Sequence, residues 1–330
     1  MPQKKSEAIQ AKAKARRKAL RESITARYPG LFPLPPVCPD RAAAVLGRDE
    51  QTRPVFVSGR ARAEHGMCIG TTGAGKTKLL EHCIRQDIVN GHAVVVVDPH
   101  GSHPDSMFRS LLGWLDSRGL TKARTIHLID PNASSHVTGL NPLELPSDDY
   151  APTVIAEAMQ EALERLWGEE RMDTKPTMQR VLSAILTVLT ELKLTLAEAR
   201  LLFDPEDRHG VRAWVIEHTL NESAREELEW LHEIAAEPRG RQDFRQEIMA
   251  PRNRIAKLTR DDAIRAMVGQ QERTIDFRAA LDDGHIILAN LSPGPRAGDK
   301  AMQLLGRLLT RLVFFHTQRR LHPEIGRAHV

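Results

Sequence analysis

The chain has 330 residues, 41% of them hydrophobic and 27% charged, which is the composition of a globular protein with room for two or three domains. Only 4% are aromatic, which argues against a large base-stacking platform for single-stranded nucleic acid. The sequence contains no apolar run of the roughly 20 residues that a membrane-spanning helix needs, and no apolar secretory signal at its start. We therefore expect a cytoplasmic protein.

Positive charge is concentrated at the N-terminus. Residues 1–30 carry nine Lys or Arg against two Glu, a net charge of +7, whereas the whole chain has only +4. We predict a basic helical arm over residues 1–28, which binds nucleic acid or an anionic membrane face, or else is a solvated arm with no dedicated partner. Binding to a membrane face would place the protein peripherally at the inner membrane.

Turn and strand signals alternate at the start of the chain. Prolines recur between residues 29 and 39, so we predict a Pro-rich linker and lead-in over residues 29–54. A short edge strand is expected at Val55–Val57, and a second strand-like run, Met67–Ile69, enters a glycine-rich loop. Apolar positions at helical spacing then predict a helix over Lys76–Val89.

The strands that follow are more deeply apolar. Four consecutive valines, Val94–Val97, predict a parallel strand buried on both faces, and Thr125–Ile129 is expected to be a third strand. We assign residues 55–150 to the first part of an α/β core. Strand character returns at His285–Leu291, so residues 281–323 are expected to complete this core.

Between these two parts the periodicity is almost wholly helical. Residues 151–280 form a block of about 130 residues, which is long enough for a core of its own. We therefore predict an α/β domain with a mostly parallel sheet, into which a large all-α domain is inserted. The predicted helices of the block and of the return to the sheet are Thr153–Leu166, Thr177–Leu192, Leu196–Leu202, Val211–Leu220, Ala224–Ile234, Phe244–Met267 and Ala301–Thr317.

The glycine-rich loop matches the whole pattern G-x-x-x-x-G-K-[ST] of phosphate-binding loops. Its glycines let the backbone approach phosphate oxygens, while backbone N–H groups and the following helix N-terminus supply positive potential. Lys76 would reach the β- and γ-phosphates of ATP, and the Thr77 hydroxyl would coordinate Mg²⁺. The alternative is a glycine-rich turn without phosphate. The predicted nucleotide contacts are Gly70, Thr71, Thr72, Gly73, Ala74, Gly75, Lys76, Thr77 and Lys78.

Asp98 ends the valine strand, and the ligand crevices of α/β proteins lie at the carboxyl ends of their strands. Its carboxylate could hold a metal-bound water, and so act indirectly on Mg²⁺, or it could orient Lys76 for catalysis. The alternative is a cap of a turn or helix, followed by Pro99.

Several motifs follow one another in a fixed order along the chain. They are the phosphate loop, VVVVDPHG at 94–101, HLIDP at 127–131, GLNPLE at 139–144, RNRI at 252–255 and TIDFRAALDDGHIILANL at 274–291. The series resembles the HerA–FtsK superfamily of DNA-translocating ATPases, and within it the conjugative coupling ATPases of type IV secretion, the TraG/TraD kind. The resemblance spans about residues 45–320. The phosphate loop alone is generic, whereas the ordered series is much more specific.

The resemblance implies a RecA-like P-loop NTPase domain in a ring, usually a homo-hexamer, that pulls DNA through a central pore with the energy of ATP hydrolysis. DNA would be held by its backbone, and a relaxase or secretion-channel proteins are further expected partners. A neighbouring subunit would complete each site with an arginine in trans, for which Arg252 and Arg254 are candidates. The alternative for both arginines is contact with DNA phosphates or acidic neighbours.

The sequence departs from this family in two respects. Coupling proteins usually carry N-terminal membrane spans, where this chain has the basic arm. The family also has a Walker B strand, an apolar run ending in Asp-Glu, whereas the strand ending at Leu291 is followed by Ser-Pro. We therefore expect a C-terminally truncated chain that binds nucleotide with little or no turnover. Residues 324–330, which a sequencing-adapter sequence can encode, are expected to be an artefactual or flexible tail.

Two other functions stay open from the sequence. A P-loop kinase of a small molecule needs a compact lid and an acceptor pocket, which the large helical block and the basic arm disfavour. A non-catalytic nucleic-acid or relaxase adaptor would bind DNA in a salt-dependent manner that ignores ATP. For a motor, DNA contacts are expected in the basic arm and in the run from Arg239 to Lys257, although the helical block could equally dock partner proteins.

Overall fold

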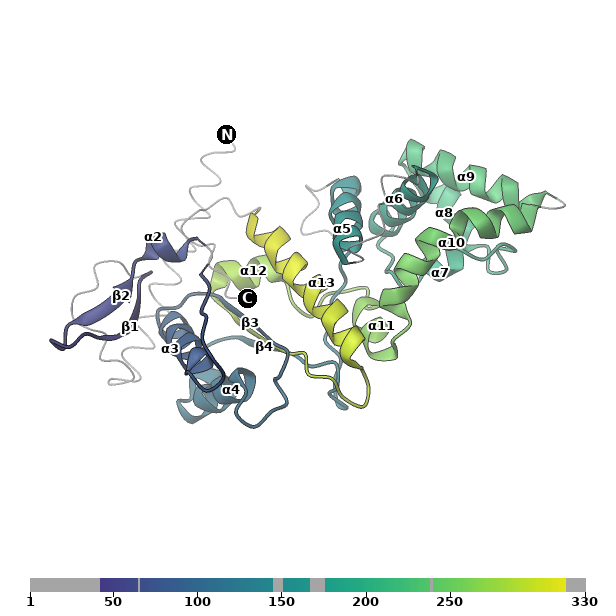
Figure 1. Cartoon of the computed structure of the whole chain (residues 1–330). Coiled ribbons are helices and arrows are strands. Elements are labelled where there is room, and N and C mark those ends of the chain that lie inside the picture. The colour runs from purple at the N-terminus through teal and green to yellow at the C-terminus, as the bar shows by residue number, and fades with distance from the viewer. Residues whose placement is uncertain (1–41, 65, 145–150, 167–175, 238–239, 319–330) are drawn as a thin grey trace, which may run out of the picture. The chain divides into compact units, whose positions relative to one another are not determined.

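The computed structural model (Figure 1) describes residues 42–64, 66–144, 151–166, 176–237 and 240–318. The chain divides into two compact units. The sheet unit comprises, among the described residues, 42–129, 277–292 and 313–318, and the helical unit comprises Asp130–Asp276 and Pro293–Leu312. The predicted basic arm, residues 29–41 of the Pro-rich linker and lead-in, and the tail at 324–330 lie outside the described residues.

A parallel sheet forms the centre of the sheet unit. Its strand order is β3 (Val94–Asp98), β5 (Ile286–Asn290) and β4 (Ile126–Ile129), with Val94 aligned to Ile286. The strand predicted near residue 285 therefore lies between two strands that precede it by more than 150 residues. Runs of branched apolar residues without a polar face suit strands that are covered on both sides. The predicted α/β class with a parallel sheet is confirmed.

Two helices pack against this sheet. Helix α3 (Lys76–Val89) has the predicted bounds, whereas α4 (Met107–Ser117) was not indicated by the sequence patterns above. The Ser106 side chain begins α4 by accepting a hydrogen bond from the Arg109 N–H at 3.2 Å. A 3-10 turn, η1 (Leu120–Lys122), follows α4. The buried core consists of Ile84, Ile88, Val94, Val96, Phe108, Leu111, Leu115, Leu120, Ile286 and Leu288.

An antiparallel hairpin precedes α3 in the chain. It joins β1 (Ala44–Arg48), which lies in the predicted lead-in, to β2 (Pro54–Val57), the expected edge strand. The Gln86 side chain of α3 binds this hairpin like a neighbouring strand, because it accepts from the Val45 N–H and donates to the Val45 carbonyl, both at 2.9 Å. A short helix, α2 (Gly59–Arg62), is held to α3 by an ion pair between Arg62 and buried Asp87.

The run Met67–Ile69 is not a strand, contrary to the sequence interpretation. Met67 and Ile69 are each 83% exposed. A strand exists only where another strand supplies hydrogen-bond partners for its backbone. No strand within the described ranges pairs with this run, so the apolar sequence enters the glycine-rich loop as irregular chain.

The helical unit is built around α6 (Pro176–Glu191), whose apolar residues are nearly all buried. It packs against α5 (Pro152–Leu166), α9 (Glu222–Ala236) and α10 (Gly240–Thr259). These helices confirm the predicted all-α insertion, and the ends of α5, α6 and α9 lie within two residues of those expected. The shorter helices of this unit are α7 (Ala199–Leu202), α8 (Val211–His218) and α11 (Asp262–Val268).

The single helix predicted over Phe244–Met267 is wrong, because the structure divides it into α10 and α11. The break lies at Asp261, whose carboxylate accepts hydrogen bonds from the N–H groups of Ala263 and Ile264, both at 3.1 Å. Aspartate favours this capping position over the middle of a helix because its short side chain competes for backbone amides. Apolar periodicity continues across the break and conceals it.

The predicted domain boundaries differ from the compact units by short segments. Residues 130–144 were assigned to the α/β core but belong to the helical unit. Helix α12 (Phe277–Asp283), not indicated by the sequence analysis, belongs with β5 in the sheet unit. Residues 281–323 were predicted to complete the α/β core, but Pro293–Leu312 belongs to the helical unit, so that α13 (Asp299–Gln318) is divided between the units. No helix among the described residues is both long and apolar enough to span a bilayer.

Candidate functional site

The glycine-rich loop runs directly into α3. Gly75 is the N-cap of this helix and has a φ of 90°, while Gly73 has a φ of 83°. Both values lie in the left-handed region that residues with a Cβ rarely adopt. The two glycines therefore set the path by which the backbone turns from the loop into the helix.

Backbone donors gather at the start of α3. The first N–H groups of any helix lack acceptors within the helix, and Gly75 supplies no side-chain oxygen to them. The first turn contains no acidic residue, so the positive end of the helix dipole is not neutralised locally. Loop residues from Gly70 to Gly75 are exposed, as is Thr77. These features fit a phosphate group.

The Lys76 side chain folds back over the loop. Its ammonium donates to the carbonyls of Gly70 and Thr71, both at 2.8 Å. The same ammonium is thus within reach of any anion that enters the loop, and the Thr77 hydroxyl stands one residue further along the exposed start of α3. The arrangement fits the predicted roles of both residues, which stay predictions.

Asp98 links β3 to α4 through backbone amides. One carboxylate oxygen accepts from the His100 N–H at 2.9 Å, and the other accepts from the Phe108 N–H at 3.0 Å. These hydrogen bonds favour the capping alternative that the sequence left open. The indirect metal role predicted for Asp98 stays a prediction, since each carboxylate oxygen retains lone pairs for a further contact.

The carboxyl ends of β3 and β5 are joined by polar residues that sequence reasoning missed. A Cβ on Gly101 would lie 2.5 Å from the Asn290 Oδ1, so only glycine permits this close approach. The Ser292 hydroxyl accepts from the Ser102 N–H at 2.8 Å, and the Asn290 amide donates to the Ser102 hydroxyl at 3.2 Å. The available signal was a buried strand ending in Asn-Leu-Ser.

Glu81 lies one turn beyond the loop on α3, and its side chain is buried. It contacts the Ser110 hydroxyl at 2.5 Å, Lys78 at 3.1 Å and the guanidinium of Arg85. Burial raises the pKa of the Glu81 carboxyl, but the hydrogen bonds from Ser110 and Lys78, together with the charges of Arg85 and Lys78, leave the pKa below its ordinary value. The ionised carboxylate ties α3 to α4 and so fixes the helix on which the loop stands.

The two candidate trans arginines lie on α10 of the helical unit, and they differ in exposure. Arg252 is exposed, whereas Arg254 is only 6% exposed. A guanidinium that completes a neighbouring site must reach out of its own subunit, so burial disfavours Arg254. The role of Arg252 stays a prediction.

The GLNPLE motif docks within the helical unit. The Gly139 N–H donates to the Thr274 hydroxyl at 2.8 Å, and the Thr274 N–H donates to the Gly139 carbonyl at 3.1 Å. Glu144 accepts from both the backbone N–H and the guanidinium of Arg273, at 2.7 and 2.9 Å. The motif therefore connects two segments that lie about 130 residues apart in sequence.

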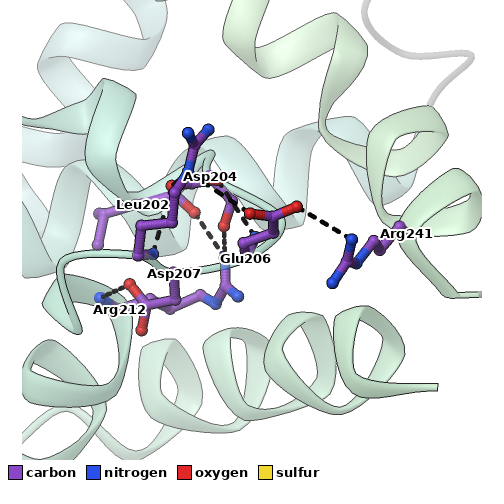
Figure 2. Close-up of polar contacts among 7 residues, drawn as sticks. Leu202, Asp204, Glu206, Asp207, Arg212 and Arg241 are labelled. Atoms are coloured by element: carbon purple, nitrogen blue, oxygen red, sulfur yellow. Dashed lines mark hydrogen bonds and ion pairs between the residues drawn. The ribbon is translucent and has the colours of Figure 1, made fainter. Parts of the chain in front are cut away.

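A buried arginine organises the other polar cluster of the helical unit (Figure 2). The Arg212 guanidinium donates to the carbonyls of Leu202 and Asp204, at 3.1 and 2.8 Å, and lies 4.7 Å from the centre of the Phe244 ring. Burial lowers the pKa of this guanidinium, although Asp207 and Asp204 oppose the shift. Asp207 also begins α8 by accepting the N–H of Arg212 at 3.0 Å. The cluster is internally satisfied and stabilises the turn between α7 and α8.

Comparison with known proteins places the chain in a family. A family model described as the type IV secretion-system coupling protein DNA-binding domain matches residues 54–231. This range is more than half of the chain, and the chain belongs to that family. No curated protein matches it.

Among solved structures, the chain is similar to the bacterial conjugative coupling protein TrwBdeltaN70 in its unbound monoclinic form. The two are 16% identical, with a TM-score of 0.43. The match covers 76% of this chain and 50% of the other, so this chain spans about half the length of that protein.

Proposed function

We propose that the chain binds ATP with Mg²⁺ at Gly70–Thr77 and is part of a DNA-translocating coupling ATPase of conjugation or type IV secretion. The observation that carries the nucleotide site is the loop itself. Two left-handed glycines, Gly73 and Gly75, lead into a helix start that has no capping side chain and no acid in its first turn. Family membership supports the wider assignment.

Each part of the loop has a distinct task in this proposal. The backbone N–H groups of the loop and of the α3 start bind phosphate oxygens. Lys76 exchanges its two carbonyl contacts for the β- and γ-phosphates, and Thr77 supplies a hydroxyl ligand to Mg²⁺. Asp98, which is anchored to the amides of His100 and Phe108, holds the β3–α4 connection in place near the same edge of the sheet.

Hydrolysis by this chain is expected to be slow. Its 330 residues contain no apolar run that ends in Asp-Glu, the pair that would polarise the attacking water and share the metal. The carboxylate of Asp98 is already engaged with two backbone amides. In a ring of subunits, burial disfavours Arg254 as the arginine that completes a neighbour's site.

Binding of a fluorescent ATP analogue with Mg²⁺ tests the nucleotide site directly. We expect Lys76→Ala to weaken binding about 10-fold or more, since a charge-assisted hydrogen bond contributes about 1.5–3 kcal/mol. Lys122→Ala, which removes an exposed lysine from the same unit, is the matched control and should bind like the wild type. Equal binding by wild type and Lys76→Ala would rule out the loop as the site.

Turnover distinguishes this proposal from its competitors. ATP hydrolysis by the pure protein that Lys76→Ala abolishes would contradict the slow turnover expected of this chain. In a longer chain that includes an acidic pair, hydrolysis stimulated by DNA is the result expected of a motor. Phosphoryl transfer to a small molecule would indicate a kinase instead, and DNA binding with no nucleotide binding would indicate an adaptor.

A further inference from the structure

Helix α10, with Arg260 directly after its last residue Thr259, presents arginines along one exposed face. The Arg260 N–H still donates to the Ala256 carbonyl, at 2.9 Å, so this residue continues the helical path. Positions 241, 245, 249, 252, 256 and 260 recur at spacings of three or four and so lie within about 100° of one another around the helix. Four of them are arginines that are all exposed, and the other two are Met249 and Ala256. We call Arg241, Arg245, Arg252 and Arg260 the arginine face.

The negative charges of α10 lie away from this face. The only carboxylates in α10 are Asp243 and Glu247, and the charge of Glu247 contributes to raising the pKa of Glu227 on α9, after the larger effect of burial. Around a helix of 3.6 residues per turn, both carboxylates lie at least about 100° from the arginine face. Glu247 is half-buried on the side where α10 packs on α9 and α6, and Asp243 is exposed. Arg254 is buried on that side as well. The two carboxylates of α10 thus lie apart from its arginine face.

The arginines differ in what already holds them. Arg241 forms an exposed ion pair with Glu206 at 3.0 Å, as Figure 2 shows. Within the part of the chain that the structure describes, no carboxylate lies within ion-pair distance of Arg245, Arg252 or Arg260. Arg245, Arg252 and Arg260 follow one another at seven and eight residues, which is about 10–12 Å along the helix axis. Three separate cations in a row on one face fit an extended polyanion rather than a single small anion.

We infer that the arginine face binds the phosphate backbone of duplex DNA, and this rests on the proposed function. From residue 241 to its end at Thr259 the helix rises about 27 Å, and Arg260 follows directly, so the face spans nearly one turn of a duplex. Guanidinium groups bind phosphate oxygens in a bidentate manner, and phosphate contacts carry no sequence preference, as a motor requires. No aromatic side chain lies on the face, so a stacked single strand is the poorer fit.

The test is the salt dependence of DNA binding by the full chain, without nucleotide, on a duplex of about 30 base pairs. The variant Arg245→Gln with Arg252→Gln and Arg260→Gln removes three cations while keeping good helix formers. Affinity falls as salt rises, and each lost phosphate contact makes the slope of log affinity against log salt shallower by about 0.9. Between 50 and 200 mM salt, wild type is therefore expected to lose about 40-fold more affinity than this variant.

Two further variants separate the face from general charge. The same three positions changed to Lys keep their cations and should keep the wild-type slope. A control with Arg109→Gln, Arg118→Gln and Arg200→Gln removes three exposed arginines elsewhere and should change the slope much less. Helical content by circular dichroism checks that each variant is folded. If the triple variant does not fold, Arg252→Gln alone is tested, and it should make the slope of log affinity against log salt shallower by about 0.9.

Three outcomes would overturn the inference. Equal loss in the arginine-face variant and in the control would mean that binding follows net charge. A larger loss on a single strand than on the duplex would exclude the duplex as the ligand. An unchanged slope in the variant would leave DNA binding to other parts of the chain. Because nucleotide is absent, none of these results depends on the Lys76 experiment, so the two proposals can fail separately.

Discussion

The two units of this protein place their polar groups in opposite ways. In the sheet unit, the candidate site is an exposed loop whose donors are backbone amides, with two left-handed glycines before α3. In the helical unit, the polar cluster around Arg212 is made of side chains and carbonyls, and Arg212 is only 1% exposed. An exposed backbone site offers unpaired donors to a ligand, whereas a buried side-chain cluster uses its donors to fix the fold. Chemistry is thus expected in the first unit and stability in the second.

The largest effect on stability is expected from replacing the buried Arg212. Arg212→Ala leaves the carbonyls of Leu202 and Asp204 without their donor and creates a cavity beside Phe244. We expect Arg212→Ala to lower the free energy of unfolding by about 3 kcal/mol or more. Arg208→Ala, which removes an exposed arginine paired with Asp204, should cost less than about 1 kcal/mol.

Amide hydrogen exchange measures the effect of Arg212→Ala in each of the two units separately. Amides of α8 should exchange faster in Arg212→Ala, while amides of α3 should keep their protection, because the two helices belong to different compact units. Equal destabilisation by Arg208→Ala and Arg212→Ala would show that burial does not distinguish the two arginines. A loss of protection in α3 would show that the units unfold together.

An intermediate effect is expected where the sheet unit depends on a glycine. Gly101→Ala places a Cβ 2.5 Å from the Asn290 side chain and 3.1 Å from its Cα, so the loop after β3 must shift. We expect Gly101→Ala to lower the free energy of unfolding by about 1–3 kcal/mol. Gly113→Ala is the matched control in α4, where a Cβ meets nothing within 4 Å, and it should stabilise by about 0.5–1 kcal/mol. Urea unfolding followed by tryptophan fluorescence, to which Trp114 of the sheet unit contributes, measures the free energy of unfolding of both variants.

The smallest expected effect is the change in stability of the sheet unit with pH. His127 Nε2 lies 3.0 Å from His285 Nδ1, and burial, followed by the charge of His285, holds the pKa of His127 below its ordinary value of 6.5. The unfolded chain therefore binds the proton first as pH falls, and the sheet unit loses stability from about pH 7 downward until the folded pKa is passed. His127→Gln should flatten this dependence.

The comparison of urea midpoints at pH 7.5 and 5.5 measures the pH effect. His100→Gln, which replaces an exposed histidine of the same unit, should leave the wild-type dependence in place. If His127→Gln and wild type lose the same stability between these pH values, the histidine pair is not the cause.

Local patterns in the sequence determined a large part of this protein. The phosphate-loop pattern depends on glycines at fixed positions and on the helix that follows, and both are properties of neighbouring residues. The bounds of α3 and the strand of valines were predicted because apolar periodicity is local. The all-α character of the insertion followed in the same way from long periodic segments.

Only the tertiary structure decided how distant segments use their polar groups. Asp98 was ambiguous in sequence because its partner at Phe108 lies on a helix that the patterns did not indicate. Arg252 and Arg254 look alike in sequence, and the packing of α10 exposes one and buries the other. Met67–Ile69 has the composition of a strand, but strand formation needs a partner strand, and apolar sequence cannot supply its own backbone hydrogen bonds.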